Sequence, residues 1–143
     1  MIVPDVNLLL HANNPVSREY TIAQNWVEAV LSGKETVGFC WPVLSGFIRI
    51  STSPRALLDP LETHEAIELV EDYISRENVV ILLPTDRHWV IFSALLITAK
   101  IRGAMTSDAE IAALTIENGG TLYTTDRGFS RYPGLKYINP LGS

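Results

Sequence analysis

Three aspartates lie at the predicted ends of secondary-structure elements, and their carboxylates are well suited to chemistry. Asp5 closely follows the apolar segment 1–3, Asp126 follows the β-prone segment 121–124, and Asp108 opens a helical pattern before that segment. In open α/β sheets ligands bind outside the carboxyl ends of the strands, so these three side chains are expected to converge. Two carboxylates about 4 Å apart repel by roughly 4 kcal/mol at an effective dielectric of about 20. A divalent cation relieves this repulsion. Oxygen-only ligands favour Mg²⁺ or Mn²⁺, whose usual work is phosphoester hydrolysis.

Local preferences alone also place aspartates at such positions. The helix dipole favours a negative charge in the first turn, and Asp86 shows the same local pattern without a chemical role. Thr124 favours the functional interpretation, because it lies two residues before Asp126, on the same face of the strand end, where packing needs no polar side chain. Asn7 is predicted to hydrogen-bond a carboxylate of the site from outside the cluster, although asparagine is also common at a helix start.

Apolar spacing predicts strands that alternate with helices along the chain. The predicted strands are 1–3, 36–40, 79–83, 121–124 and 135–138, and the predicted helices are 5–12, 17–32, 43–51, 66–76, 85–102, 108–117 and 126–132. Parallel strands need helical crossovers of this kind. The sequence therefore predicts an α/β sandwich with a mostly parallel central sheet.

Capping residues and hydropathy set further expectations. Ser17 is predicted to cap the second helix, and Ser107 with Glu110 matches a capping box. The continuous apolar run 79–83 is typical of a central strand that is covered on both faces. The apolar stretch 89–99 is too short to cross a bilayer, which needs about 20 residues, and is predicted to be a buried helix.

Composition indicates a single packed domain over residues 1–143. Hydrophobic residues make up 47% of the chain and charged residues 19%, which disfavours disorder. The single cysteine, Cys40, excludes an intramolecular disulfide and a multi-cysteine metal site. Sixteen acidic residues against eleven Lys and Arg give a net charge of −5, so any phosphate must be contacted locally. The first residues lack the basic region of a signal peptide, and we expect a cytoplasmic protein without membrane contact.

A longer pattern covers nearly the whole chain. It consists of segments 2–9 (IVPDVNLL), 107–114 (SDAEIAAL) and 119–135 (GGTLYTTDRGFSRYPGL). This pattern resembles the PIN-domain family, and within it the VapC-type ribonuclease toxins of bacterial toxin–antitoxin pairs. The resemblance implies a three-layer α/β/α sandwich and an Mg²⁺- or Mn²⁺-dependent endoribonuclease that cleaves structured RNA such as tRNA or rRNA. It also implies inhibition by a cognate VapB-type antitoxin. Asp5, Asp108 and Asp126 fall on acidic positions of the family and are expected to be its catalytic, metal-binding residues here.

Two departures from the family pattern affect the expected site. The family usually carries a glutamate in the helix after the second strand, where this chain has Gly46, and often an aspartate where this chain has Gly128. Three acids suffice for one metal ion rather than two. The missing glutamate keeps open an alternative, a non-catalytic PIN-fold module that holds an antitoxin or RNA. A receiver-type signalling domain is disfavoured, because the first strand supplies one aspartate rather than an acidic pair.

Arginines and tryptophans complete the sequence-based expectations. Arg49, Arg127 and Arg131 flank the segments that bear the site and are the predicted RNA phosphate contacts. The three tryptophans stand in apolar contexts and are predicted to be core or dimer contacts rather than platforms for stacking bases; they are Trp26, Trp41 and Trp89. We expect a homodimer.

Overall fold

The computed structural model describes residues 1–142 and contains one five-stranded sheet. Its strands are β1 (Ile2–Pro4), β2 (Val37–Phe39), β3 (Val79–Ile81), β4 (Thr121–Tyr123) and β5 (Tyr137–Ile138). Their order across the sheet is β3-β2-β1-β4-β5, and all four pairings are parallel. The predicted α/β class with a parallel sheet is therefore confirmed.

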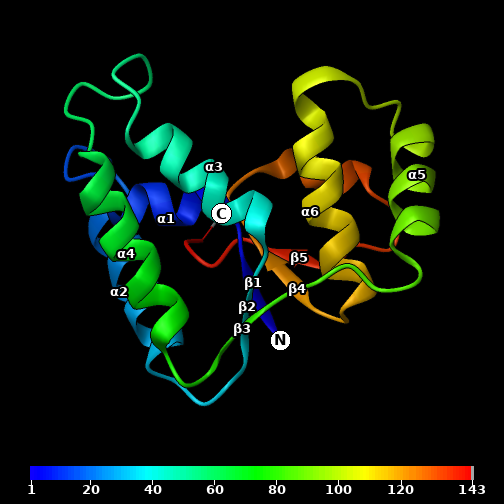
Figure 1. Ribbon diagram of the computed structural model, residues 1–143, viewed down its shortest axis with the longest axis horizontal. Helices are drawn as coiled ribbons and strands as arrows, with labels where there is room; N and C mark the ends of the chain where they lie inside the picture. The colour runs from blue at the N-terminus through cyan, green and yellow to red at the C-terminus, as the bar shows by residue number, and fades with distance from the viewer. Residues whose placement is uncertain (143) are drawn as a thin grey trace.

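Helices lie on both sides of the sheet. They are α1 (Val6–Ala12), α2 (Tyr20–Leu31), α3 (Trp41–Ser51), α4 (Thr63–Ser75), α5 (His88–Thr98) and α6 (Thr106–Glu117), with short 3₁₀ helices η1 (Gly103–Met105) and η2 (Arg127–Arg131). Figure 1 shows α1, α2 and α4 on one side of the strands and α5 with α6 on the other. This is the predicted three-layer sandwich. No helix within residues 1–142 is both long and apolar enough to span a membrane.

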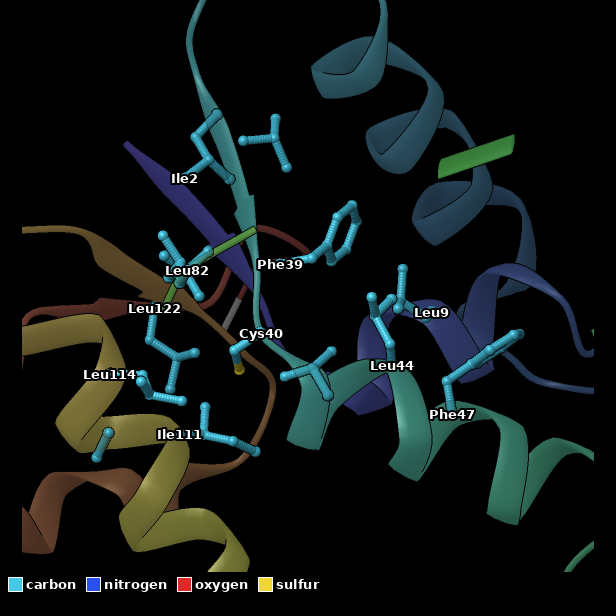
Figure 2. Close-up of a cluster of buried hydrophobic side chains, with 14 of the residues drawn as sticks. Ile2, Leu9, Phe39, Cys40, Leu44, Phe47, Leu82, Ile111, Leu114 and Leu122 are labelled. Atoms are coloured by element: carbon cyan, nitrogen blue, oxygen red, sulfur yellow. The ribbon is translucent and has the colours of Figure 1, made fainter. Parts of the chain in front are cut away.

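The hydrophobic core fills both faces of the sheet. Phe39 of β2 packs with Leu9, Leu44 and Phe47 on the side of α1 and α3, whereas Leu122 of β4 meets Ile111 and Leu114 of α6, as Figure 2 shows. These side chains are almost completely buried. Each face of the sheet is therefore packed against helices, which fixes the positions of the residues that follow its inner strands.

The chain reverses its direction across the sheet between β1 and β4. From β1 it winds to β2 and β3, then returns to place β4 on the other side of β1. Pro4 pairs with Tyr123, and the backbone N–H of Asp5 donates to the Tyr123 carbonyl at 2.9 Å. In doubly wound sheets ligands bind at such a switch point. The residues that follow β1 and β4 stand at this point.

Two predictions about apolar segments are wrong. The run 79–83 is not a central strand, because β3 lies at the edge of the sheet and Val80 and Leu83 are exposed. The stretch 89–99 is not buried: α5 packs on α6 rather than on the sheet, and Trp89 and Ile97 are 69% and 79% exposed. Hydropathy indicates that both segments are apolar, but it does not indicate how many helices or strands will pack against them.

Two predicted helix caps are also wrong. Helix α2 begins at Tyr20 rather than beside Ser17, whose hydroxyl oxygen accepts from the Glu19 N–H in a turn ahead of the helix. Helix α6 begins at Thr106 with Met105 at the cap, so Ser107 lies inside the first turn and makes no capping box with Glu110. The preceding 3₁₀ turn, η1, runs directly into α6 and shifts its start toward the N-terminus.

Candidate active site

Asp5 connects the end of β1 to the start of α1 and is only 5% exposed. Its Oδ1 accepts from the N–H of Val6 at 2.8 Å, and its Oδ2 accepts from the hydroxyl of Thr124 at 2.7 Å. The pKa of Asp5 is raised to about 6: burial raises it most, the hydrogen bonds from Thr124 and Val6 lower it in part, and the negative charges of Asp108 and Asp126 raise it. The carboxylate therefore lies within electrostatic reach of the two other predicted site acids.

Thr124 and Asn7 form the polar link between the two strand ends. Thr124 is buried, and besides donating to Asp5 its Oγ1 accepts from the Asp126 N–H at 3.0 Å and from Asn7 Nδ2 at 3.3 Å. The Oδ1 of Asn7 in turn accepts from the Thr125 N–H at 3.4 Å. Asn7 thus reaches the carboxylate through the threonine rather than directly. The network holds the Asp5 side chain in one orientation.

Asp108 and Asp126 approach from α6 and from the end of β4. Asp108 lies in the first turn of α6, and its pKa is raised by burial and by the charge of Asp126, while Arg131 lowers it. Asp126 is exposed, and its Oδ1 accepts from the Gly128 N–H at 2.7 Å. A side chain at position 128 would crowd this bond, because an added Cβ would lie 2.9 Å from the same Oδ1. Gly128 therefore fits the turn that orients Asp126.

Arg131 is the basic residue whose charge reaches Asp108. Its Nε donates to the Gly128 carbonyl at 2.7 Å, and its Nη1 lies 3.3 Å from the sulfur of Met105 ahead of α6. Arg127, although it directly follows Asp126 in the chain, is not the basic residue whose charge reaches Asp108. The structure instead places Arg127 beside Asp126 and the β5 end, in a small cavity of about 110 Å³. The 3₁₀ turn of η2 brings Arg131 back toward α6, and this proximity cannot be inferred from the position of Arg131 in the sequence.

Gly46 lies on the buried face of α3, against the residue that follows Asp5. An added Cβ would lie 3.2 Å from Val6 Cγ2 and 3.9 Å from Arg49 Nη2. A side chain at position 46 would therefore enter beside the start of α1, next to the candidate site. The guanidinium of Arg49 borders the same space.

The donor set of the site matches a hard divalent cation. Asp5, Asp108 and Asp126 offer only carboxylate oxygens, and their mutual charges raise the pKa values of the first two, a repulsion that a bound cation would relieve. Over residues 1–142, no group of three His, Cys, Asp or Glu side chains is already arranged to hold a metal ion. The three side chains are therefore of the right type for such an ion, but they would have to move closer to one another to coordinate a single ion.

Two of the three tryptophans lie outside the core, so a dimer contact remains the prediction for them, and the acid predicted to close a helix cap has another place. Trp26 packs against the core and stacks on Tyr123 with ring centroids 5.5 Å apart, as expected, but Trp41 is 53% exposed and Trp89 is exposed on α5. Glu110 lines a cavity next to the site rather than closing a helix cap. No signal in the sequence distinguishes these positions, because exposure depends on how α3 and α6 face each other.

Comparison with known proteins agrees with this geometry. The family model described as PIN domain matches residues 2–135. Ribonuclease VapC33 of Mycobacterium tuberculosis is 36% identical over 141 residues, which cover 99% of both chains. Ribonuclease VapC37 of the same organism is 31% identical over 140 residues, covering 98% of this chain and 97% of the relative. The chain therefore belongs to the PIN-domain family, in its VapC branch.

Solved structures share the same fold at lower identity. VapBC-1 of nontypeable Haemophilus influenzae matches with a TM-score of 0.69 at 17% identity, covering 98% of each chain. VapC20 of Mycobacterium tuberculosis, described as a sarcin-ricin loop cleaving toxin, matches with a TM-score of 0.68 at 16% identity over 95% of this chain and 99% of that one. VapBC2 of Rickettsia felis, bound to a promoter DNA fragment, has a TM-score of 0.67 at 21% identity over 97% and 98%.

Proposed function

We propose that this chain is a metal-dependent endoribonuclease toxin of the VapC type, which cleaves structured RNA such as tRNA or rRNA and is neutralised by a cognate VapB-type antitoxin. The observation that carries the proposal is the charge of the site at the switch point of the sheet. Three carboxylates act on one another there, and the buried one has a pKa of about 6. Packing alone gives no reason to gather like charges, whereas a cation-binding site requires it.

Asp5, Asp108 and Asp126 would hold the metal ion, Mg²⁺ or Mn²⁺. When bound, such an ion supplies an activated water and neutralises charge on a scissile phosphate. The residues of the chain prepare the site for it. Thr124 orients the Asp5 carboxylate by donating to Oδ2, and Asn7 holds the threonine.

The positive side chains at the rim would position the RNA backbone. Arg131 lies next to Asp108 and Arg127 beside Asp126, both on η2, whereas Arg49 lies over Gly46 on α3, so the three flank the acidic site from two elements. Guanidinium groups bind phosphate oxygens in a fixed, often bidentate geometry. They would hold the phosphodiester against a site whose own charge repels it.

Two protein partners follow from the surface and from the structural relatives. The relatives include VapBC complexes, and an antitoxin arginine could pair with the site carboxylates in place of the metal. A second copy of this chain is the expected partner of α5, which carries no Asp, Glu, Lys or Arg and exposes Trp89, Val90 and Ile97. An exposed apolar helix of this kind is typical of a homodimer interface.

One observation favours a second candidate function. Position 46, where the family usually has a glutamate, is a glycine packed against Val6, and α3 therefore supplies no carboxylate at this position. A domain that retains the fold but binds the cation too weakly for catalysis would act as a non-catalytic module that holds an antitoxin or RNA. The two functions differ in whether purified protein cuts RNA.

The test is cleavage of total tRNA and rRNA by purified protein with Mn²⁺ or Mg²⁺, compared with the same reaction in EDTA. We expect metal-dependent cleavage that is lost in Asp108→Asn, because the amide keeps the shape of the side chain but not the charge that attracts the cation. Asp86→Asn, at an exposed position away from the site, is the matched control and should cleave normally. Equal cleavage by Asp108→Asn and the control would refute the assignment, and metal-independent RNA binding without cleavage would favour the non-catalytic module.

A further inference from the structure

A cavity of about 340 Å³ opens next to the candidate active site, between α3 and the N-terminal part of α6. Gly46 and Ser107 both line it. Gly46 contacts the residue after Asp5, and Ser107 directly precedes Asp108, so the cavity borders the site from two sides. A nucleotide adjacent to the scissile phosphate would reach this cavity.

Trp41 provides an aromatic wall that the fold itself does not use. It opens α3 and is 53% exposed, whereas Cys40 before it and Val43 after it are completely buried. Burying the indole instead would contribute to stability, so an exposed tryptophan beside a polar cavity is a candidate for a bound partner. Indole rings stack on nucleobases, and single-stranded RNA is commonly held in this way.

Arg49 and Glu110 bring opposite charges to the same cavity. Within residues 1–142 neither forms a salt bridge or a side-chain hydrogen bond, so both groups remain available. The absence of a side chain at Gly46 leaves room for the arginine, whose Nη2 lies 3.9 Å from where a Cβ would be. A guanidinium suits a phosphate, and a carboxylate accepts hydrogen bonds from N–H groups on the edge of a base.

We propose that this cavity binds one guanine nucleotide of the RNA substrate, an inference that rests on the proposed ribonuclease function. The base stacks on Trp41, its phosphate contacts Arg49, and the carboxylate of Glu110 accepts from the base edge. Guanine matches this carboxylate best, because only its Watson–Crick edge presents two adjacent N–H donors. The cavity thus selects the base next to the cleaved bond.

The test uses four fluorescein-labelled RNA hexanucleotides, five uridines with one central guanine, adenine, cytosine or uridine, and measures their affinity by fluorescence anisotropy in EDTA. We expect the guanine hexamer to bind most tightly. Trp41→Ala should weaken binding of all four by roughly tenfold, because stacking is sequence-tolerant. Trp41→Phe should retain most of the affinity, because phenylalanine keeps an aromatic face on which a base can stack. Glu110→Gln should abolish the preference for guanine over adenine while leaving the adenine hexamer bound as before.

Matched controls remove an exposed apolar side chain and an exposed acid elsewhere. Ile22→Ala on α2 and Glu68→Gln on α4 should bind all four hexamers like the unmodified chain. Circular dichroism and light scattering on every variant check folding and oligomeric state. Equal losses in Ile22→Ala and Trp41→Ala would overturn the inference, as would a guanine preference that survives Glu110→Gln.

The two proposals fail in different ways. If the unmodified chain cleaves tRNA with Mn²⁺ but Trp41→Ala binds the hexamers unchanged, the nucleotide cavity is refuted and the ribonuclease stands. If Trp41→Ala loses the dimer, or loses the antitoxin while RNA binding persists, the cavity belongs to that partner and the inference is again overturned. If the unmodified chain neither binds nor cleaves RNA, both proposals fall.

Discussion

Replacing Asp5 with asparagine should change how the free energy of unfolding depends on pH. The pKa of this carboxyl is raised from 3.8 to about 6, mainly by burial and in part by the charges of Asp108 and Asp126, against the lowering effect of the hydrogen bonds from Thr124 and Val6. Between these two pH values the folded protein binds a proton that the unfolded chain has released. The ionised carboxylate therefore costs stability, and the cost grows as the pH rises from about 4 to about 6.

The magnitude follows from the size of the shift. A difference of roughly 2 pKa units corresponds to about 3 kcal/mol at neutral pH, an upper value because like-charged neighbours share the effect. About 1 kcal/mol of this cost is already present at pH 4.5, so the contribution of Asp5 to the free energy of unfolding falls by about 2 kcal/mol between pH 4.5 and pH 7.5. Asparagine does not titrate, and its altered hydrogen bonds cost the same at both pH values. When the pH is raised from about 4.5 to about 7.5, the free energy of unfolding of Asp5→Asn should therefore increase by about 2 kcal/mol relative to that of the unmodified chain.

Urea unfolding in EDTA at the two pH values measures this change. Asp86→Asn is the matched control, because it removes one negative charge from an exposed position, and it provides the baseline for the whole-protein charge. Adding Mn²⁺ at neutral pH should stabilise the unmodified chain and not Asp5→Asn, by mass action on the folded state. A stability difference that stays constant with pH would show that the Asp5 carboxylate is not destabilised by its surroundings and would refute this reasoning.

Three further variants test the elements around the site. Thr124→Val should lower the free energy of unfolding, measured in urea, by about 2 to 3 kcal/mol, because it removes a donor to the buried Asp5 carboxylate and leaves two N–H groups unpaired. Thr124→Ser keeps the hydroxyl and should lower it by only about 1 kcal/mol. Similar losses in the two variants would argue against the hydroxyl network. Gly46→Glu should bind Mn²⁺ severalfold more tightly than Gly46→Ala in calorimetric titrations, because its carboxylate enters beside Val6; equal affinities would show that position 46 does not face the ion. His88→Ala should cost about 1 to 3 kcal/mol, because Nδ1 lies 2.6 Å from the Glu117 carboxylate, whose side chain is 1% exposed; an unchanged urea midpoint would contradict this.

Local sequence pattern was sufficient for the alternation of strands and helices and for the approximate place of each element, although most element ends differ by one to four residues from the predicted ones. The apolar segment 1–3 became β1, and Asp5 directly follows it, as the predicted turn into a short helix requires. Asp126 likewise follows β4. These features depend on neighbours within a few residues, which the chain itself supplies. They were enough to name the three acids and to expect them at the carboxyl ends of parallel strands.

Tertiary structure decided which of these elements lie next to one another. The order of the sheet puts β4 beside β1 and leaves β3 at the edge, although the run 79–83 is as apolar as a central strand. It also leaves α5 exposed and turns Arg131, rather than Arg127, toward Asp108. Hydropathy and spacing describe what a segment can bury or contact. Whether it does so depends on residues that are distant in the chain, and only the folded arrangement brings those residues to it.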